Sequence, residues 1–175
     1  MTKLSIITAV FNRVTTIEDT ILSVANQNHS DVEHIVVDGA STDGTLDVIN
    51  RHRDKLARVV SEVDGGVYHA MNKGLSIASG EVIGFLNSDD FYENAHVLEK
   101  VSSVMADPSV DACYADLVYV DLRDSSRNVR YWKSCAYRTG LFEHGWVPPH
   151  PTFFVRRSVY ERLGGFNLAF QLAAD

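Results

Sequence analysis

The 175-residue sequence has little cysteine, no long hydrophobic run and no excess of positive charge. Its two cysteines, Cys113 and Cys135, form no CxxC pair and are too few for a disulfide framework, so reduced thiols of a cytosolic protein are expected. No stretch approaches the roughly 20 apolar residues of a membrane span, and Asn12 and Arg13 interrupt the N-terminal apolar run, which argues against a signal peptide. The net charge of −7 argues against general nucleic-acid binding, which needs a basic face.

What is present is the composition of an ordinary soluble domain, with 45% hydrophobic and 22% charged residues. The first half alternates short apolar runs with helical patterns. Strands are predicted over residues 4–9, 33–37, 58–62 and 82–86, and helices over residues 16–27, 45–51 and 67–78. This alternation predicts an α/β fold with a mostly parallel sheet and helices on both faces.

The second half changes character after about Asp90. A helix is predicted over residues 95–105, followed by strands over residues 112–115, 118–122 and 129–133, with residues 124–128 as the turn of a hairpin. A rigid proline-rich loop over residues 146–151 precedes a strand over 152–155 and a helix over 158–163, which the Gly164-Gly165 pair caps. The pattern predicts a smaller antiparallel portion within one domain.

Four polar segments follow the predicted strands, over residues 11–13, 38–44, 64–66 and 87–90. Ligands of open parallel sheets bind beyond the carboxyl ends of the strands, so we expect these segments to meet along one edge. In the second segment, Ser41, Thr42 and Asp43 suit a helix cap, while the Asp38 carboxylate can accept hydrogen bonds from a base or ribose. We expect both roles there.

The fourth segment, Asn87-Ser88-Asp89-Asp90, places two carboxylates directly after a buried strand. Mg²⁺ and Mn²⁺ usually take one or two protein carboxylates together with substrate phosphates. Such a cation can stabilise a departing diphosphate. The alternative is a solvated acidic turn without a ligand.

Isolated cations and histidines are weaker signals. Arg13 and Lys73 are the cations nearest the predicted edge, although a solvated helix face explains Lys73 equally well. The seven histidines show no metal-ligand spacing, and His150, inside the proline-rich loop, is a candidate for substrate contact.

Five ordered motifs now point to a family. The chain resembles the family 2 glycosyltransferases, which have a Rossmann-like GT-A fold, through residues 5–13, 35–45, 61–74, 80–90 and 150–157. The resemblance implies a nucleotide-sugar donor, a saccharide or lipid-linked acceptor, a divalent cation (Mn²⁺ or Mg²⁺), inversion at the anomeric carbon and a carboxylate base. Together with the change of pattern after Asp90, it predicts a single domain over residues 1–175, with a nucleotide-sugar-binding half over residues 1–90 and an acceptor-side half over residues 91–175, incomplete at its C-terminal end.

The same resemblance implies roles for individual residues. Asp89 occupies the metal-binding position of the family's DXD motif. Asn87 stands at the first acidic position of that motif, and His69 stands where aspartate is expected. The residues that match nucleotide-sugar contacts are Thr8, Ala9, Phe11, Asn12, Arg13, Asp38, Asn72, Lys73, Asn87, Ser88 and Asp89.

Asp175, the last residue, matches the family's catalytic base. A positioned carboxylate that accepts the proton of an acceptor hydroxyl assists its attack. The rival acids of the second half are Asp116, Asp121 and Glu143. Because family members continue well beyond this point, we expect a C-terminally truncated fragment that is not fully active by itself.

Three functions follow in order of support. The first is glycosyl transfer in cell-surface polysaccharide assembly, in the cytoplasm or, through a lipid-linked acceptor, peripherally at the inner face of the membrane. The second is a nucleotide-sugar-binding domain without turnover, which Asn87 and the short C-terminus favour. The third is a nucleotidyltransferase, but residues 8–13 lack the glycine-rich phosphate loop that it needs. The donor base, sugar, acceptor and oligomeric state are left open.

Overall fold

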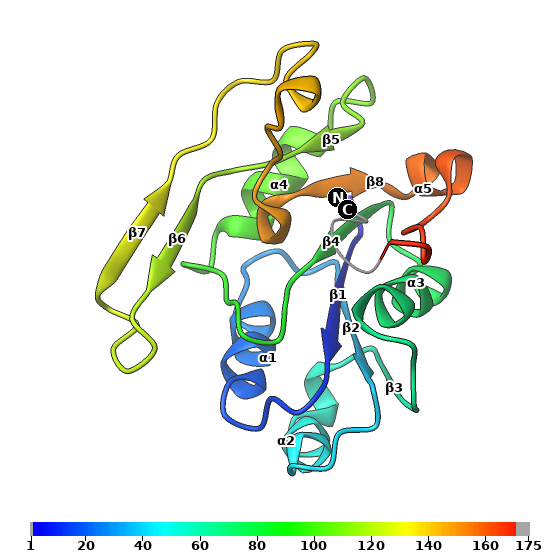
Figure 1. Ribbon diagram of the computed structural model, residues 1–175, viewed down its shortest axis with the longest axis vertical. Helices are drawn as coiled ribbons and strands as arrows, with labels where there is room; N and C mark the ends of the chain where they lie inside the picture. The colour runs from blue at the N-terminus through cyan, green and yellow to red at the C-terminus, as the bar shows by residue number, and fades with distance from the viewer. Residues whose placement is uncertain (1, 171–175) are drawn as a thin grey trace.

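The computed structural model describes residues 2–170 and contains a six-stranded sheet with the strand order β3-β2-β1-β4-β8-β5 (Figure 1). The central strands β1, β2 and β4 consist mainly of buried apolar residues, as expected where helices cover both faces of a sheet. The strands of this sheet are β1 (Leu4–Val10), β2 (Val32–Asp38), β3 (Arg58–Ser61), β4 (Val82–Phe85), β5 (Ala112–Cys113) and β8 (Phe154–Arg156).

The first four strands run parallel, so their carboxyl ends share one edge of the sheet. Ile7 of β1 lies opposite Ile35 of β2 on one side and Phe85 of β4 on the other. β8 pairs antiparallel with both β4 and β5, which completes the far side of the sheet. The prediction of a mostly parallel sheet with an antiparallel portion is confirmed.

Helices cover both faces of this sheet. On one face, apolar side chains of β1 such as Leu4 and Ile6 pack with α1 (Ile17–Ala25) and α4 (Val97–Met105), and those near its end pack with α1 and α2 (Thr45–Arg51). On the other face, Ile7 packs with α3 (Val67–Ile77). Successive residues of β1 thus enter different cores, as the two-residue repeat of a strand requires.

The second half adds a separate antiparallel hairpin of β6 (Leu117–Val120) and β7 (Asn128–Trp132), which projects from the main sheet in Figure 1. Short 3-10 turns lie at Arg53–Lys55, Phe142–His144 and His150–Thr152, and the last helix is α5 (Arg157–Leu163). Gly164 ends α5 with a φ of +90°, which confirms the glycine cap.

The predicted strands differ from the observed ones by one or two residues at their ends, and two of these differences have a clear local cause. The strand expected over residues 152–155 begins only at Phe154, because His150–Thr152 form a 3-10 turn in which the Thr152 N–H donates to the Pro149 carbonyl at 2.9 Å. The strand expected over residues 112–115 is limited to Ala112–Cys113, because pairing with β8 ends at Cys113. Neither difference changes the architecture.

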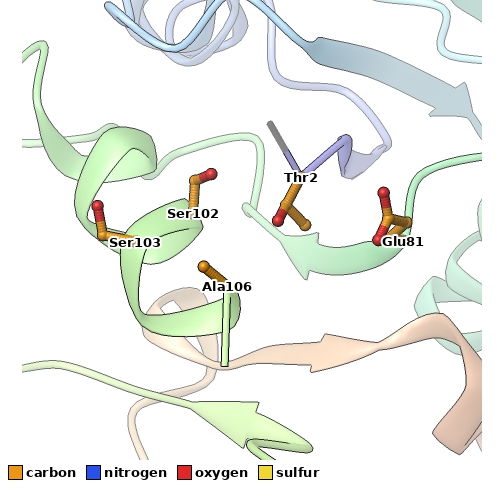
Figure 2. A pocket seen from close by; sticks show the side chains of 5 residues that line it. All are labelled: Thr2, Glu81, Ser102, Ser103 and Ala106. Atoms are coloured by element: carbon orange, nitrogen blue, oxygen red, sulfur yellow. The ribbon is translucent and has the colours of Figure 1, made fainter. Parts of the chain in front are cut away.

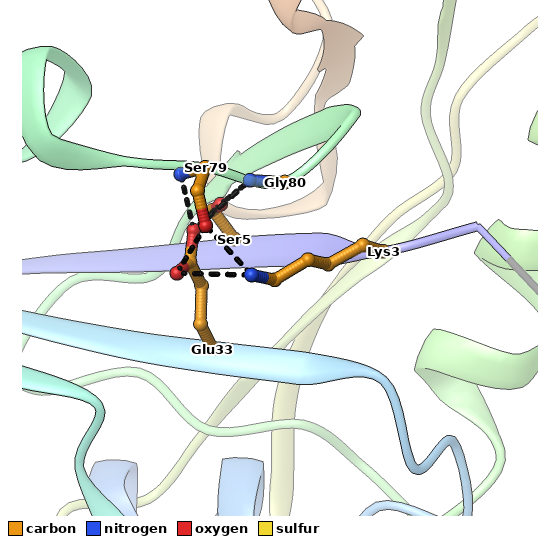
Figure 3. A network of polar contacts seen from close by, with 5 residues as sticks. All are labelled: Lys3, Ser5, Glu33, Ser79 and Gly80. Carbon is orange, nitrogen blue, oxygen red and sulfur yellow. Dashed lines mark hydrogen bonds and ion pairs between the residues drawn. The ribbon is translucent and has the colours of Figure 1, made fainter.

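A buried carboxylate connects the amino ends of the parallel strands through hydrogen bonds (Figure 3). Glu33 of β2 accepts hydrogen bonds from Ser5 of β1 and from Ser79 and Gly80 of the turn before β4, including 3.0 Å from the Gly80 N–H to Oε1. Burial alone would raise the pKa of Glu33, but these hydrogen bonds outweigh it and hold that pKa below its usual value. This network sets the position from which β4 enters the sheet.

Candidate functional site

A cavity of about 690 Å³ lies at the carboxyl ends of the parallel strands and is called the edge cavity below. Its lining comes from all four polar segments that follow these strands: residues from 9–13, 39–40, 63–70 and 87–89 contribute. The strand order brings these segments together even though they are separated along the chain by up to about 80 residues.

The acidic turn after β4 presents its two carboxylates differently. Asp89 is exposed and lines the edge cavity, whereas Asp90 is not among the lining residues of the described chain and accepts a 2.9 Å hydrogen bond from Asn87 Nδ2 at Oδ2. Burial raises the pKa of Asp90, and the neighbouring charge of Asp89 adds to this, while the bond from Asn87 opposes it. Asp89 is therefore the carboxylate of this turn that can meet a ligand.

Helix α1 and Thr16, the residue that precedes it, hold the same turn in place. Thr16 Oγ1 donates to the Ser88 carbonyl at 2.8 Å, and Thr20 Oγ1 donates to the Asp90 carbonyl at 2.8 Å. Thr20 is fully buried, so its hydroxyl has no competition from solvent. The backbone of the acidic turn is thus fixed by side chains from a different layer of the fold.

The loop after β1 crosses to the loop after β2. Asn12 adopts a left-handed φ of +52°, its N–H donates to Ser41 Oγ at 2.8 Å, and its Oδ1 accepts from the Thr42 N–H at 2.9 Å. Asn12 therefore connects the two loops. Its neighbours Phe11 and Arg13 line the cavity, whereas Asn12 is not among the described lining residues. Phe11 is 58% exposed, so its side chain is open to solvent at the cavity.

Two of the matched residues are buried. Thr8 is fully buried on the face opposite α3, and its Oγ1 lies 3.0 Å from His34 Nε2. Asp38 is also fully buried, and its carboxylate accepts hydrogen bonds from Ser41 and from Ser61 Oγ, the latter at 2.6 Å. Asp38 thus connects the loop after β2 with the end of β3, whereas Thr8 contacts strand β2, and Ala9 is among the lining residues.

Asp64 is a lining residue to which the sequence interpretation gave no role, although it begins one of the four polar segments. Its Oδ1 accepts from the Gly66 N–H at 2.8 Å, which shapes the turn into α3. A Cβ at Gly39 would lie 3.1 Å from Asp64 Oδ2 and 3.4 Å from the Phe11 ring, so the loops approach closely here. Its place after the third parallel strand was the signal that could have identified Asp64.

Three further candidates within the described residues, Asn72, Lys73 and Asp116, are not part of the lining of the edge cavity. Lys73 forms an ion pair with Glu62 at 2.7 Å, and the Asn72 amide bonds to the backbone of Phe166. Asp116 is engaged by the Tyr131 hydroxyl and the Ser134 N–H within the region of the β6–β7 hairpin. Asp175 lies outside the described residues.

Another cavity, of about 460 Å³, lies at the opposite ends of the strands (Figure 2). Thr2 and Glu81, which precede β1 and β4, line it together with Ser102, Ser103 and Ala106 from the end of α4. The described residues of this lining offer one carboxylate and small hydroxyls, and none of them has an aromatic or cationic side chain. The edge cavity has the richer chemistry and lies where the fold places ligands.

Comparison with known sequences decides the family. The sequence profile described as "Glycosyl transferase family 2" matches residues 5–164, which is most of the chain. The chain belongs to glycosyl transferase family 2. The edge cavity is therefore formed by the segments that carried the family resemblance, and the GT-A fold expected from that resemblance is confirmed by solved structures.

Sequence relatives of this family 2 chain include a "PGL/p-HBAD biosynthesis glycosyltransferase" of Mycobacterium bovis, 32% identical over 174 residues. The match covers 98% of this chain and 66% of that relative. The putative teichuronic acid biosynthesis glycosyltransferase TuaG of Bacillus subtilis is 36% identical over 104 residues, which is 58% of this chain and 41% of the relative. The chain thus spans slightly less than two thirds of the mycobacterial relative's length.

Two solved structures share the fold. The mannosyltransferase PcManGT from Pyrobaculum calidifontis, solved with GDP-Man and Mn²⁺, superposes with a TM-score of 0.72 at 25% identity, over 95% of this chain and 48% of its own. TarS of S. aureus superposes with a TM-score of 0.74 at 22% identity, over 98% of this chain and 52% of the solved one. Family 2 membership and fold therefore rest on both sequence and structure.

Proposed function

We propose that this chain is the donor-binding part of an inverting, metal-assisted glycosyltransferase that moves a sugar from a nucleoside-diphosphate sugar to a saccharide or lipid-linked acceptor. The observation that carries the proposal is the composition of the edge cavity, which combines the exposed Asp89 with Phe11 and Arg13 at the carboxyl ends of parallel strands. These groups suit the phosphates, base and charge of such a donor. Residues 1–90 would supply the donor site and residues 91–175 the acceptor side.

Each group of the lining has a distinct task in this proposal. The exposed ring of Phe11 and the 83%-exposed Val63 offer apolar contact to a nucleobase. The Arg13 guanidinium offers charge-assisted hydrogen bonds to the diphosphate. The Asp64 carboxylate can accept hydrogen bonds from the base or ribose, in the role that the family resemblance assigned to Asp38. The backbone of Ala9, Asn87 and Ser88 completes the wall beside the sugar-diphosphate.

The residues present fit a divalent cation that shares its coordination with the donor. Asp89 offers an exposed carboxylate, and the Asn87 side-chain oxygen is a neutral ligand of the kind that hard cations accept. Among residues 2–170, no three His, Cys, Asp or Glu side chains gather into a metal site of their own. Mn²⁺ or Mg²⁺ would therefore bind through Asp89 together with phosphate oxygens, as these cations commonly do.

In the proposed reaction, the oxygen of an acceptor hydroxyl attacks the anomeric carbon of the donor sugar. The bond from that carbon to the diphosphate breaks, its electron pair stays on the diphosphate oxygen, and the hydroxyl proton passes to the Asp175 carboxylate. When bound, the cation stabilises the charge on the departing diphosphate. Asp89 lies on the leaving-group side, so a different acid must receive the proton on the opposite face.

We propose further that a lipid-linked acceptor brings the protein to the inner face of the membrane from the cytoplasm. No helix within the described part of the chain is long and apolar enough to cross a bilayer. The β6–β7 hairpin carries Leu122, which is 92% exposed, and Tyr131, which is 59% exposed, beside Arg123 and Arg130. Exposed apolar and cationic side chains together favour an anionic lipid surface.

Vesicle sedimentation tests the membrane proposal. Vesicles of phosphatidylcholine with phosphatidylglycerol should bind the wild-type protein more than pure phosphatidylcholine vesicles do. Replacing Leu122 and Arg123 by glutamate should remove this difference without changing the melting temperature, since both side chains are exposed. Equal binding by the variant and the wild-type protein would contradict the proposed surface.

A thermal-shift panel tests the donor site. UDP, GDP, UDP-N-acetylglucosamine and GDP-mannose are added with and without Mn²⁺, and a selective binder raises the melting temperature by mass action. We expect one base to stabilise the protein with Mn²⁺ and to do less without it. A flat response to the whole panel would contradict the proposal. If the full-length protein binds a nucleotide-sugar but does not cleave it to the nucleoside diphosphate, a binding domain without turnover is favoured instead.

A further inference from the structure

The side-chain amide of Asn72 in α3 forms two hydrogen bonds with the backbone of Phe166. Asn72 Nδ2 donates to the Phe166 carbonyl at 2.9 Å, and the Phe166 N–H donates to Asn72 Oδ1 at 2.8 Å. The two residues are 94 positions apart in the sequence. One amide thus satisfies both polar groups of a single backbone unit, as a neighbouring strand would.

The ring of Phe166 is buried beside this double hydrogen bond, with 8% of its surface exposed. It stacks on Tyr68 of α3 at 5.5 Å between centroids and meets Phe85 of β4 edge-on at 5.0 Å. His150 and Tyr160 lie slightly farther from the ring, at 6.3 and 6.4 Å. Backbone and ring of Phe166 are therefore both fixed against α3 and its neighbours.

Gly165 permits this close approach. A Cβ at Gly165 would lie 2.3 Å from Asn72 Oδ1 and 3.3 Å from the Leu75 side chain, and the first distance is shorter than real Cβ contacts allow. The glycine and the asparagine therefore form a matched pair. In Figure 1 the red segment after α5 runs beside α3, in agreement with these contacts.

The same helix reaches the edge cavity. α3 begins at Val67, and Gly66, Val67 and Ala70 line the cavity, while Asn72 follows within the next turn. Asn72 itself is not among the lining residues of the described chain, and both ends of its amide are already bonded to Phe166. Helix α3 thus contacts the donor cavity at its start and the segment 164–170 farther along.

We propose that Asn72 is a positioning residue that ties the segment 164–170 to the helix that lines the donor cavity. This segment leads to the candidate base Asp175, nine positions after Phe166 in the sequence. By fixing Phe166 against α3, Asn72 would set the position, relative to the donor, from which the chain continues toward the base. The inference rests on the proposed function, and it assigns Asn72 a task other than nucleotide contact.

Three variants and a control separate this role from general stability. Asn72→Ala removes both hydrogen bonds, and Asn72→Asp keeps the acceptor for the Phe166 N–H but loses the donor to its carbonyl. Gly165→Ala forces the segment away from the asparagine. Ser76→Ala is the control, because Ser76 lies exposed on the same helix and its hydroxyl donates a local hydrogen bond to the Lys73 carbonyl.

Hydrogen–deuterium exchange measures whether Asn72 fixes the segment. We expect amide exchange over residues 164–170 to rise roughly tenfold or more in Asn72→Ala, since two hydrogen bonds are lost. Asn72→Asp and Gly165→Ala should show increases too, and exchange in α2 and the Ser76→Ala control should stay at the wild-type rate. Unchanged exchange over 164–170 in folded Asn72→Ala would overturn the proposal.

Kinetics of the full-length protein then separate positioning from a purely structural role. Release of nucleoside diphosphate is followed with UDP-N-acetylglucosamine and GDP-mannose in the presence of Mn²⁺. Asn72→Ala should lower kcat about tenfold or more while donor KM stays within about twofold, and Ser76→Ala should match the wild type. Faster exchange with an unchanged kcat would overturn the positioning role. A wild-type protein that cleaves neither donor would contradict the proposed function, and the exchange result would still decide whether Asn72 fixes the segment.

Discussion

Asn87 Nδ2 donates a hydrogen bond to Asp90 Oδ2 at 2.9 Å, and this bond separates the tasks of the two acids in the turn after β4. Asp90 is held inside the turn, while Asp89 stands exposed at the edge cavity. The residue at the first position of the metal-binding motif thus acts on its own turn. A neutral amide suits this position, since a carboxylate there would repel Asp90.

Asp89→Ala should remove Mn²⁺-dependent nucleotide binding, and Asp90→Ala should weaken it less. Asp89 is the carboxylate that faces the ligand, and loss of even an outer partner of a metal site typically costs about 10–100-fold in affinity. Titrating Mn²⁺ into each variant in the presence of UDP or GDP measures the difference. Equal losses in the two variants would remove the ranking of the two acids.

Thr20→Val should destabilise the acidic turn by removing a hydrogen bond that α1 donates to its backbone. The variant keeps the shape of the side chain but leaves the Asp90 carbonyl without its 2.8 Å hydrogen bond, which costs roughly 1–3 kcal/mol for a buried group. Chemical denaturation and Mn²⁺-dependent nucleotide binding should both weaken. Thr20→Ser keeps the hydroxyl and is the matched control, so similar losses in both variants would show that the methyl group and not the hydrogen bond matters.

His34 should make folding sensitive to mild acid. Burial lowers the pKa of His34 to about 3 from an ordinary 6.5. Below pH 6.5 the His34 side chain is therefore protonated in the unfolded chain but stays neutral in the folded one. Stability should therefore fall as the pH drops below 6.5, by on the order of 1 kcal/mol per pH unit. Melting temperatures between pH 7.5 and pH 5 measure the slope, which should be shallower in His34→Gln. The same slope in both proteins would contradict this assignment.

Asp64→Asn should weaken donor binding in the absence of a cation. Asp64 lines the edge cavity away from the acidic turn, and its carboxylate is proposed to accept hydrogen bonds from the base or ribose. The amide offers a donor at one of these positions, so we expect a loss of roughly tenfold, as for a charge-assisted hydrogen bond. Calorimetry with UDP or GDP in metal-free buffer measures it. If Asp64→Asn lowers nucleotide affinity only in the presence of Mn²⁺, Asp64 would instead be a ligand of the cation.

Asp175→Asn in the full-length protein should reduce turnover by at least roughly 100-fold, a typical effect of losing a general base. Donor binding should stay within about twofold, because the base meets the acceptor and not the nucleotide. Turnover with an identified acceptor and calorimetry with the donor provide the two readouts. Near-normal turnover would reject Asp175, and Glu143, exposed in the turn Phe142–His144, would be the next candidate.

Much of the donor side could be predicted from the sequence because it depends on strand order. Buried apolar runs predicted β1, β2 and β4, and parallel strands must deliver their following loops to one edge. The meeting of Phe11, Asp64 and Asp89 around one cavity follows from that rule. The β6–β7 hairpin was also predicted, because short runs rich in β-branched and aromatic residues flank a polar turn there.

Side-chain direction was harder to predict. β1 and β2 are buried on both faces, so no alternation of polar and apolar residues shows which way Thr8 or Asp38 points. Both side chains are buried: Thr8 contacts His34 of β2, and Asp38 holds the loop after β2 through Ser41. The partner of Asn72 was not predictable either, because 94 residues separate it from Phe166 and no local pattern records such a contact.

The central claim is that a nucleoside diphosphate and a divalent cation bind in the edge cavity. A crystal structure with Mn²⁺ and the diphosphate that stabilises the protein most tests it directly. The account predicts the base against Phe11, the diphosphate near Arg13, and the cation bound between a phosphate oxygen and Asp89. A nucleotide located elsewhere, such as the cavity beside Thr2 and Glu81, or a cation without contact to Asp89, would contradict the account.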